Sequence, residues 1–183
     1  QAARLTAADS TTGLGGSVAL TEDRLFVGSG KTLTMTESDT TSAAAVHVFE
    51  RAEDGSWSEA TLLRGSQLSS ESGFGSSLIA GSGHLLVSAP KYEGGAVVAF
   101  RQKEGAWTEI QTLSTSALGS SAQFGHSLQG AGETQIVVGA PRAYDATGVA
   151  YTFSYDTDAQ QWRTQGRLLP FDGASRHLFG AAV

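Results

Sequence analysis

The sequence of 183 residues contains no cysteine, only three prolines and a single methionine. The absence of cysteine excludes disulfides, thiolate metal sites and cysteine nucleophiles. It does not decide the compartment, because exported proteins can also lack cysteine. Redox chemistry at cysteine is therefore excluded, whereas the location of the protein stays open.

Charge is also scarce, since only 16% of the residues are Asp, Glu, Lys or Arg, against about 25% in an ordinary soluble domain. Twelve basic and eighteen acidic residues give a net charge of −6, and no cluster of Lys or Arg occurs. Binding to nucleic acid or to an anionic membrane normally requires such a cluster. We therefore expect no nucleic-acid partner.

Long apolar runs are missing too. No stretch approaches the roughly 18 apolar residues that cross a bilayer, so we expect no membrane insertion. The first residues, Gln1 to Arg4, lack the charged and then apolar pattern of a signal peptide. We expect that the protein has no such peptide or that it was removed.

Glycine, in contrast, is abundant, with 23 residues in a chain of 183, against a usual share of roughly 7%. Apolar residues make up 40% of the chain, which is enough for a packed core. The composition therefore predicts a folded, glycine-rich protein rather than a disordered one.

A repeat with a period of 50 to 60 residues runs through the chain. Its clearest marker is a Phe-Gly pair, at Phe74-Gly75, Phe124-Gly125 and Phe179-Gly180, with Leu14-Gly15 in the same place at the start. The intervals are 60, 50 and 55 residues, from position 14 to 74, 124 and 179. In the units that follow, a β-type run ends in small residues, an alternating stretch ends in Phe, and a Trp comes next.

Each unit thus holds four short runs of β-type residues separated by turns, without the apolar spacing of a helix. Four strands in about 50 residues are typical of one blade of a β-propeller. We therefore predict an all-β fold of four-stranded antiparallel meanders. Residues 1–183 would form one partial propeller domain, with blades at about 14–64, 74–114 and 124–170, the last strand of a preceding blade at 3–6 and the first strand of a following blade at 179–183.

The repeated residues have a structural interpretation. Glycines such as Gly75 and Gly125 are expected on crowded inner strands, and Phe74 and Phe124 are expected to pack between blades. Trp57, Trp107 and Trp162 are expected to start the outer strands and to pair across strands with Phe49, Phe100 and Phe153. The alternative for the Trp stripe is that its aromatic faces bind sugar rings.

A Phe-Gly pair followed by a strand that ends in Gly-Ala-Pro resembles the FG-GAP repeat, the unit of the integrin α-subunit propeller and of many exported bacterial proteins. The third copy is complete, from Phe124-Gly125 to Gly139-Ala140-Pro141. The second has Ser88 in place of Gly, and the first has Leu14 for Phe and Gly28-Ser29-Gly30 for Gly-Ala-Pro. The resemblance covers essentially the whole chain and implies an extracellular, secreted or cell-surface protein with a role in adhesion or recognition.

The resemblance also implies a ring of seven blades, which at about 50 residues each would need roughly 350 residues. Three blades cannot close such a ring, so we expect this chain to be a segment of a longer one. The alternative is that separate copies assemble. In either case the expected partners are the remaining propeller blades, in the same chain or in another copy.

Integrin-like repeats often carry an acidic calcium loop between their first two strands, and calcium takes about six to eight oxygen ligands. Of the three corresponding turns here, one contains Glu22 and Asp23, one contains no acid, and one contains only Glu133. We therefore expect no metal and no other cofactor in these blades, and calcium only in blades outside this sequence. The acidic pairs in Glu37-Ser38-Asp39 and Asp156-Thr157-Asp158 are interpreted as solvated turns.

A catalytic constellation is not recognisable. The recurrent Ser17, Ser77 and Ser127 are interpreted as small inner-strand residues rather than nucleophiles. Four different repeat positions hold the histidines, which are His47, His84, His126 and His177. Of these, His126 is expected to lie near the channel. The sequence has no metal-binding spacing, phosphate loop or dinucleotide motif, so we predict that the chain is not an enzyme.

Strand parity places the long loops on one face of the predicted fold, and these loops are 29–44, 65–73, 114–123 and 170–177. Function tends to reside on long loops held by a rigid scaffold, so this face is the predicted ligand site. The alternative is that each loop is a solvated connector. The candidate ligand residues are Lys31, Glu37, Asp39, Lys91, Tyr92, Arg142, Tyr144 and Asp145.

These observations favour a non-catalytic recognition or adhesion module that binds a protein or a glycan through the long-loop face. One alternative is the propeller portion of a secreted carbohydrate-active enzyme or lectin, whose chemistry would lie outside these blades. A purely structural or assembly role is the other.

Overall fold

The computed structural model of the chain describes residues 5, 14–29, 44–69, 71–81 and 83–183, which form three four-stranded antiparallel sheets. Sheet 1 consists of β1 (Leu14–Leu20), β2 (Arg24–Ser29), β3 (Val46–Arg51) and β4 (Trp57–Leu63). Sheet 2 consists of β5 (Leu78–Gly81), β6 (His84–Ala89), β7 (Ala96–Lys103) and β8 (Ala106–Ser114). Sheet 3 consists of β9 (Ser127–Ala131), β10 (Gln135–Ala140), β11 (Val149–Asp156) and β12 (Gln161–Leu168).

Two short turns complete the described elements, a 3-10 turn η1 (Ser116–Leu118) and a helical turn α1 (Ala143–Ala146). Neither is long enough to cross a membrane, and no other helix occurs in the described part of the chain. The prediction of an all-β fold with four-stranded antiparallel units is therefore confirmed.

Within each sheet the strands pair in sequence order, so each sheet is a simple meander. The β7–β8 hairpin illustrates the local cause. Lys103 pairs with Ala106, and the two residues between them, Glu104 and Gly105, have φ of +52° and +84°. Two successive positive φ values give a tight turn whose twist matches that of the strands, and glycine lowers the cost of the turn.

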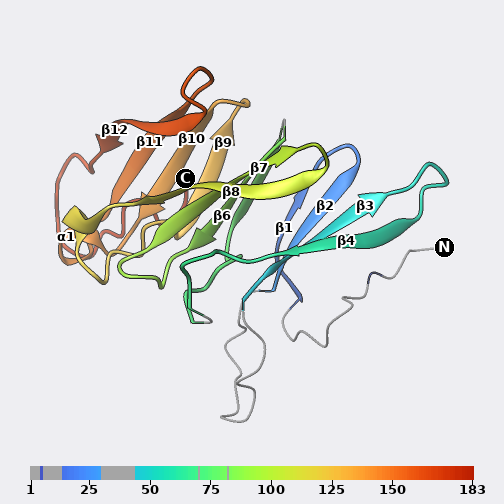
Figure 1. Cartoon of the computed structure of the whole chain (residues 1–183). Helices are drawn as coiled ribbons and strands as arrows, with labels where there is room; N and C mark the ends of the chain where they lie inside the picture. Colours follow the sequence, from blue (N-terminus) through green and yellow to red (C-terminus); the bar gives the residue numbers. More distant parts are fainter. Residues whose placement is uncertain (1–4, 6–13, 30–43, 70, 82) are drawn as a thin grey trace, which may run out of the picture.

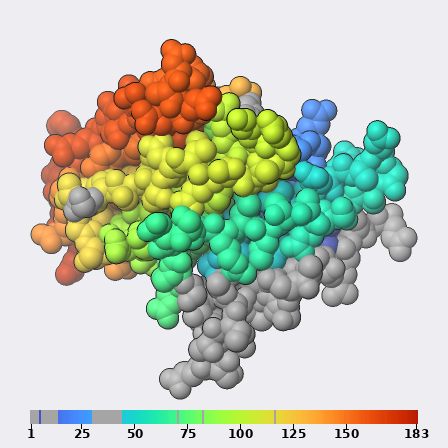
Figure 2. Space-filling model, in the orientation of Figure 1, coloured from blue at the N-terminus to red at the C-terminus, as the bar shows by residue number. Residues whose placement is uncertain are grey.

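The three sheets lie in a row in the order of the sequence, with sheet 2 in the middle (Figure 1). One buried apolar cluster, which includes Phe26 and Leu85, joins sheet 1 to sheet 2. A second cluster, which includes Leu86 and Ile136, joins sheet 2 to sheet 3. In Figure 2 the green and yellow band of sheet 2 accordingly separates the cyan surface of sheet 1 from the orange surface of sheet 3.

The two central strands of sheet 2 are buried on both faces, and their sequence reflects this. Along β6, Leu85 and Val87 belong to the cluster shared with sheet 1, whereas Leu86 belongs to the cluster shared with sheet 3. Successive side chains of a strand point to opposite faces, so a strand covered on both sides needs apolar residues at successive positions. The unbroken apolar runs in β6 and β7 meet that need.

The Phe-Gly pairs lie where one sheet meets the next. Phe74 is buried in the cluster between sheets 1 and 2, and Phe124 is buried in the cluster between sheets 2 and 3. Phe124 also forms an isolated parallel bridge with Gly95, and Phe179 forms an equivalent bridge with Gly148. The marker thus combines side-chain packing with backbone pairing between neighbouring units.

In sheets 1 and 3, a glycine on the second strand permits this close approach between neighbouring units. A Cβ atom on Gly139 would overlap with the carbonyl oxygen of Gly180 and with the hydroxyl of Ser127. A Cβ atom on Gly28 would overlap in the same way with the carbonyl oxygen of Gly75. At the start of Gly139-Ala140-Pro141, a glycine is therefore required, because the backbone of the following unit leaves no room for a side chain.

The predicted position of Gly75 and Gly125 on inner strands is wrong. Strand β5 begins only at Leu78 and β9 at Ser127, and both glycines lie in the turns before these strands. Their φ values of +88° and +85° are in the left-handed region, which favours glycine. Turn geometry explains these two glycines, and at Gly125 a close approach adds to it, because a Cβ atom would lie 2.8 Å from the carbonyl oxygen of Ala96.

Where a first strand was predicted, at 179–183, the structure shows an isolated bridge at Phe179 followed by a turn. In sheets 2 and 3 the Phe-Gly pair lies before the first strand. A strand predicted to start at the pair itself therefore begins a few residues too early. The strand predicted at 3–6 lies outside the described residues, except for Leu5, which belongs to no strand.

The tryptophans start the outer strands as predicted, but the predicted pairing with Phe is wrong. The cross-strand partners of Trp57, Trp107 and Trp162 are Arg51, Gln102 and Tyr155. Trp107 instead packs edge-on against Phe26 of sheet 1, with ring centroids 5.4 Å apart. Trp162 is buried near His84 of sheet 2, with ring centroids 6.3 Å apart. These two rings therefore join neighbouring sheets.

Candidate functional site

The meander topology brings the long connections to one end of the strands, because alternate connections of an antiparallel sheet lie at the same end. Within the described residues these connections are 64–69 with 71–77, 90–95, 115–126, 141–148 and 169–178. We call this end the long-loop face. It is the face that the sequence predicted as the ligand site, and the turns at the other end, such as 21–23, are shorter.

Backbone hydrogen bonds hold the connections of this face against one another. The amide of Lys91 donates to the carbonyl of Ser72 at 2.9 Å, and the amide of Arg142 donates to the carbonyl of Ala122 at 3.1 Å. Each of these basic residues directly follows a proline, so the repeat presents a cation at one recurrent position. Lys31 follows Gly30 at the same position of the first repeat, but it lies outside the described residues.

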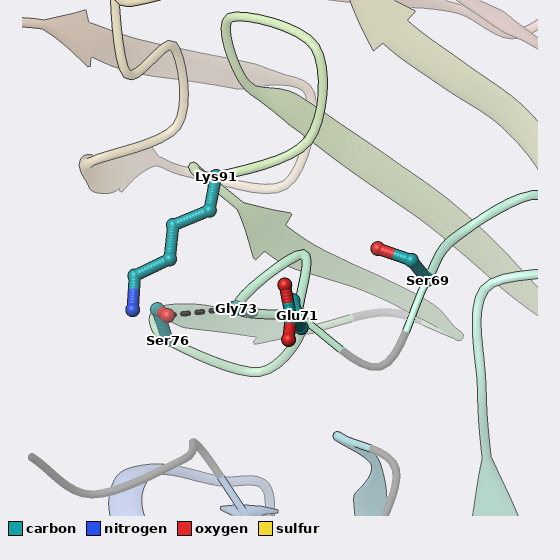
Figure 3. A pocket seen from close by; sticks show the side chains of 5 residues that line it. All are labelled: Ser69, Glu71, Gly73, Ser76 and Lys91. Carbon is teal, nitrogen blue, oxygen red and sulfur yellow. Dashed lines mark hydrogen bonds between the residues drawn. The ribbon is translucent and has the colours of Figure 1, made fainter.

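A pocket of about 410 Å³, which we call the Lys91 pocket, opens on the long-loop face at sheet 2. Its described lining residues are Ser69, Glu71, Gly73, Ser76 and Lys91 (Figure 3). The lining offers an amine, a carboxylate and two hydroxyls, and its volume falls within the range of about 300 to 1,000 Å³ that is usual for small-ligand sites.

The charged groups of the Lys91 pocket remain accessible. Lys91 and Glu71 are both exposed, and neither forms an ion pair with another described residue. The hydroxyl of Ser76 is oriented by a hydrogen bond that it donates to the carbonyl of Gly73 at 2.5 Å (Figure 3). The described lining contains no histidine that could activate a serine, and its amine, carboxylate and hydroxyls can all form hydrogen bonds with a polar ligand.

A second pocket of about 370 Å³, which we call the Tyr144 pocket, opens on the same face at sheet 3. Its lining residues are Tyr144, Thr147, Arg167, Leu169, Pro170 and Gly173. A guanidinium N–H of Arg167 donates a long hydrogen bond of 3.4 Å to the hydroxyl of Tyr144. This pocket therefore combines one cation and two hydroxyls with apolar side chains.

Tyr151 lies behind this pocket, directly across from Arg167 in the β11–β12 pair. Burial raises the pKa of the Tyr151 hydroxyl, and the charge of an ionised Tyr144 raises it further, whereas Arg167 lowers it. We predict that Tyr144→Phe lowers the pKa of Tyr151, and that Arg167→Ala raises it. Titration of labelled tyrosine ring carbons by NMR would measure both changes, with Tyr92→Phe as the control. An unchanged Tyr151 pKa in both variants would contradict the proximity of the three side chains.

Several acidic groups elsewhere are engaged in local contacts. Arg24 forms ion pairs with Asp23 at 2.8 Å and with Glu50 at 3.1 Å. Asp156 accepts hydrogen bonds from the amides of Ala159 and Asp158 and from the side chain of Arg163, and its pKa is lowered by these bonds, above all by that from Ala159. Across the described residues, no group of three or more His, Asp or Glu side chains is arranged to hold a metal ion.

The predicted ligand residues fall into several groups. Lys91 and Tyr144 each line a pocket, whereas Arg142 and Asp145 are exposed on the long-loop face without lining either pocket. Tyr92 is half-buried against the core between sheets 1 and 2, so its prediction as a ligand residue is not favoured by its packing. Three further residues lie outside the described residues, namely Lys31, Glu37 and Asp39.

Sequence reasoning missed most of the residues that line the two pockets beside Lys91 and Tyr144. Glu71 and Pro170 lie in loops that the sequence had singled out by length, but no local pattern marks them as members of a pocket. Arg167 lies on β12 and carried no signal in the sequence. Only the packing of the sheets brings the two sides of each pocket together.

None of the three recurrent serines lines a pocket described above. Ser77 bonds to Ser88 within its own unit, whereas Ser17 and Ser127 make contacts between units. The hydroxyl of Ser17 donates to the carbonyl of Gly75 at 2.5 Å, and that of Ser127 donates to the carbonyl of Gly180 at 2.9 Å. His126 is exposed in the turn before β9.

No protein-family model and no curated protein matches the chain.

Proposed function

We propose that the chain is a non-catalytic recognition module, built from β-propeller blades of the FG-GAP type, that binds a protein or a glycan through its long-loop face. Its place of action would be extracellular, as a secreted or cell-surface protein. The propeller interpretation is supported by three meanders stacked in sequence order and by the proximity of their first strands, β1, β5 and β9. The repeated Phe-Gly junction supports the FG-GAP resemblance.

The Lys91 pocket is the observation that carries the binding role. Its loops are tied together by the bond from Lys91 to Ser72, so the polar groups are presented by a scaffold that is ordered before a ligand arrives. A preformed site loses less conformational entropy on binding than a flexible one. An amine and a carboxylate without ion-pair partners among the described residues would form charged hydrogen bonds with a polar ligand.

We predict that Lys91→Ala weakens binding to the preferred ligand about tenfold, which corresponds to about 1.4 kcal/mol. The measurement is biolayer interferometry against immobilised gelatin and a panel of neutral and acidic polysaccharides. The matched control is Lys103→Ala, because Lys103 is exposed in the β7–β8 hairpin at the opposite end of the strands. Circular dichroism melting curves would verify that both variants fold.

Two outcomes would contradict the proposal. One is that no member of the panel binds, or that binding is unchanged by substitutions in both the Lys91 pocket and the Tyr144 pocket. The other is that a bound polysaccharide is cleaved, which an assay for new reducing ends would detect.

A further inference from the structure

The Tyr144 pocket differs in chemistry from the Lys91 pocket. Its lining includes Leu169, which is 50% exposed, Tyr144, which is 43% exposed, and Pro170. Exposed side chains of this size on a concave surface favour contact with an apolar ligand surface. The Lys91 pocket, in contrast, has no large apolar side chain among its described lining residues.

Arg167 supplies the charge in this apolar setting. Within the described ranges it has no carboxylate partner, and its side chain donates a long hydrogen bond of 3.4 Å to the hydroxyl of Tyr144. A guanidinium group has five N–H donors in a fixed planar arrangement, so most of them remain available. Two parallel N–H groups match the two oxygens of a carboxylate, which makes a carboxylate the most suitable anion.

The backbone that carries Tyr144 is strained. Tyr144, Asp145 and Ala146 have φ of +53°, +53° and +62°, so three successive residues with side chains are left-handed. In the equivalent loop of sheet 2, two of the positive-φ positions are the glycines Gly94 and Gly95. Strain of this kind persists where surrounding contacts enforce it, and it is concentrated at ligand sites.

Contacts on both sides enforce this turn. The amides of Thr147 and Gly148 donate to the carbonyls of Tyr144 and Ala143, both at 3.0 Å, and the amide of Leu178 donates to the carbonyl of Ala146 at 2.9 Å. Tyr144, which is part of α1, is thereby held beside Arg167 near the end of β12. The pocket is thus fixed by the backbone rather than formed by mobile side chains alone.

We propose that the Tyr144 pocket binds a uronic-acid unit of an acidic polysaccharide. The carboxylate of the sugar pairs with Arg167, the apolar face of its ring packs on Tyr144, Leu169 and Pro170, and its hydroxyls bond to the hydroxyls of Thr147 and Tyr144. This inference rests on the proposed function, because it names a ligand class for a second part of the long-loop face.

The lining favours a uronic acid over other anions. A phosphate group is commonly bound by several cations or by a set of backbone amides, whereas this pocket has a single arginine beside apolar side chains. An acidic peptide side chain would engage Arg167 but has no rigid ring to cover Tyr144, Leu169 and Pro170. A sugar acid carries both a carboxylate and an apolar ring face, so it uses the whole lining.

The test compares oligogalacturonate with the same oligomer after complete methyl esterification, by isothermal titration calorimetry on the wild-type chain. Esterification removes the charge but keeps the ring and the hydroxyls. We expect the acidic form to bind at least tenfold more tightly, and we expect added salt to reduce this preference. Poly-glutamate serves as the acidic peptide and should bind at least tenfold more weakly than oligogalacturonate.

Variants assign the binding to the pocket. Arg167→Ala should weaken oligogalacturonate binding at least tenfold and abolish the preference over the ester, and Arg167→Lys should be intermediate, since lysine keeps the charge but not the planar pair of donors. Tyr144→Ala should weaken both oligomers by a similar factor. The matched control is Arg163→Ala on the same strand, because Arg163 is exposed and pairs with Asp156 outside the pocket.

Failure of this inference can be told apart from failure of the proposed function. Equal affinity for the two oligomers, equal affinity for poly-glutamate, or dependence on Lys91 instead of Arg167 would each overturn the uronic-acid assignment and leave a recognition role intact. Absence of binding to both oligomers would also overturn the assignment, while the polysaccharide and gelatin panel decides the recognition role separately.

Discussion

Gly95→Ala should be among the most destabilising single substitutions in this chain, with a loss of about 3 kcal/mol or more in the free energy of unfolding. Gly95 is buried and has φ of +109°. A Cβ atom at this position would overlap with the backbone of Phe124, to which Gly95 is bridged. The substitution would therefore both strain the loop of sheet 2 and push sheet 3 away from it.

Urea unfolding followed by tryptophan fluorescence would measure this loss, and Gly105→Ala is the matched control. Gly105 has φ of +84°, but a Cβ atom there would meet nothing within 4 Å. Gly105→Ala should lower the free energy of unfolding by only about 1 to 2 kcal/mol, the cost of placing a residue with a Cβ atom in the left-handed region. Equal losses in the two variants would contradict a tight junction between Gly95 and Phe124.

The meander architecture was predictable because it depends on local patterns that recur. The run Leu85 to Pro90 and its counterparts at 25–30 and 136–141 mark the second strand of each sheet, and Phe100 and its counterparts mark the third. Turn residues separate these runs, so the four-strand unit could be inferred without any knowledge of contacts. The Phe-Gly marker was recognised by recurrence, although its conformation as a turn was not.

The contacts between strands and between sheets were not predictable in the same way. Each sheet has a register shift in the pairing of its last two strands, between Val48 and Phe49 in sheet 1, and such an irregularity leaves no clear mark in a single sequence. The hairpin length also sets the partner of Trp107, which is Gln102 rather than Phe100. The contact of Trp107 with Phe26 depends on the packing of two sheets and not on either segment alone.

The candidate site illustrates the same limit. Loop length and the position of Lys91 after a proline pointed to the face on which the Lys91 pocket opens. The other lining residues come from the segment on both sides of Phe74, and they lie beside Lys91 because its amide donates a hydrogen bond to the carbonyl of Ser72. Arg167 reaches Tyr144 only because β12 ends beside the left-handed turn of α1. Side chains from separate segments can be assigned to one pocket only when the path of each segment is known.

Phe124→Ala should cost about 3 to 5 kcal/mol, because a fully buried aromatic ring would be replaced by a cavity between sheets 2 and 3. Phe124 makes edge-on contacts with Tyr151 at 5.9 Å and with Phe153 at 6.1 Å between ring centroids, and both contacts would be lost. The free energy of unfolding from urea titration is the measurement. Phe124→Leu keeps most of the buried volume and should cost clearly less.

Phe179→Ala provides the informative comparison, because Phe179 occupies the same place in the repeat and forms the same bridge to the preceding sheet. Its amide donates to the carbonyl of Thr147 at 3.0 Å, as that of Phe124 donates to Gly94 at 2.8 Å. Phe179 is only half-buried, so its loss should cost no more than about 2 kcal/mol. A cost equal to that of Phe124→Ala would contradict this exposure and would mean that a further layer covers Phe179 in solution. Sedimentation of the chain at several concentrations would then distinguish a second copy from a layer within the same molecule, because only association of copies depends on concentration.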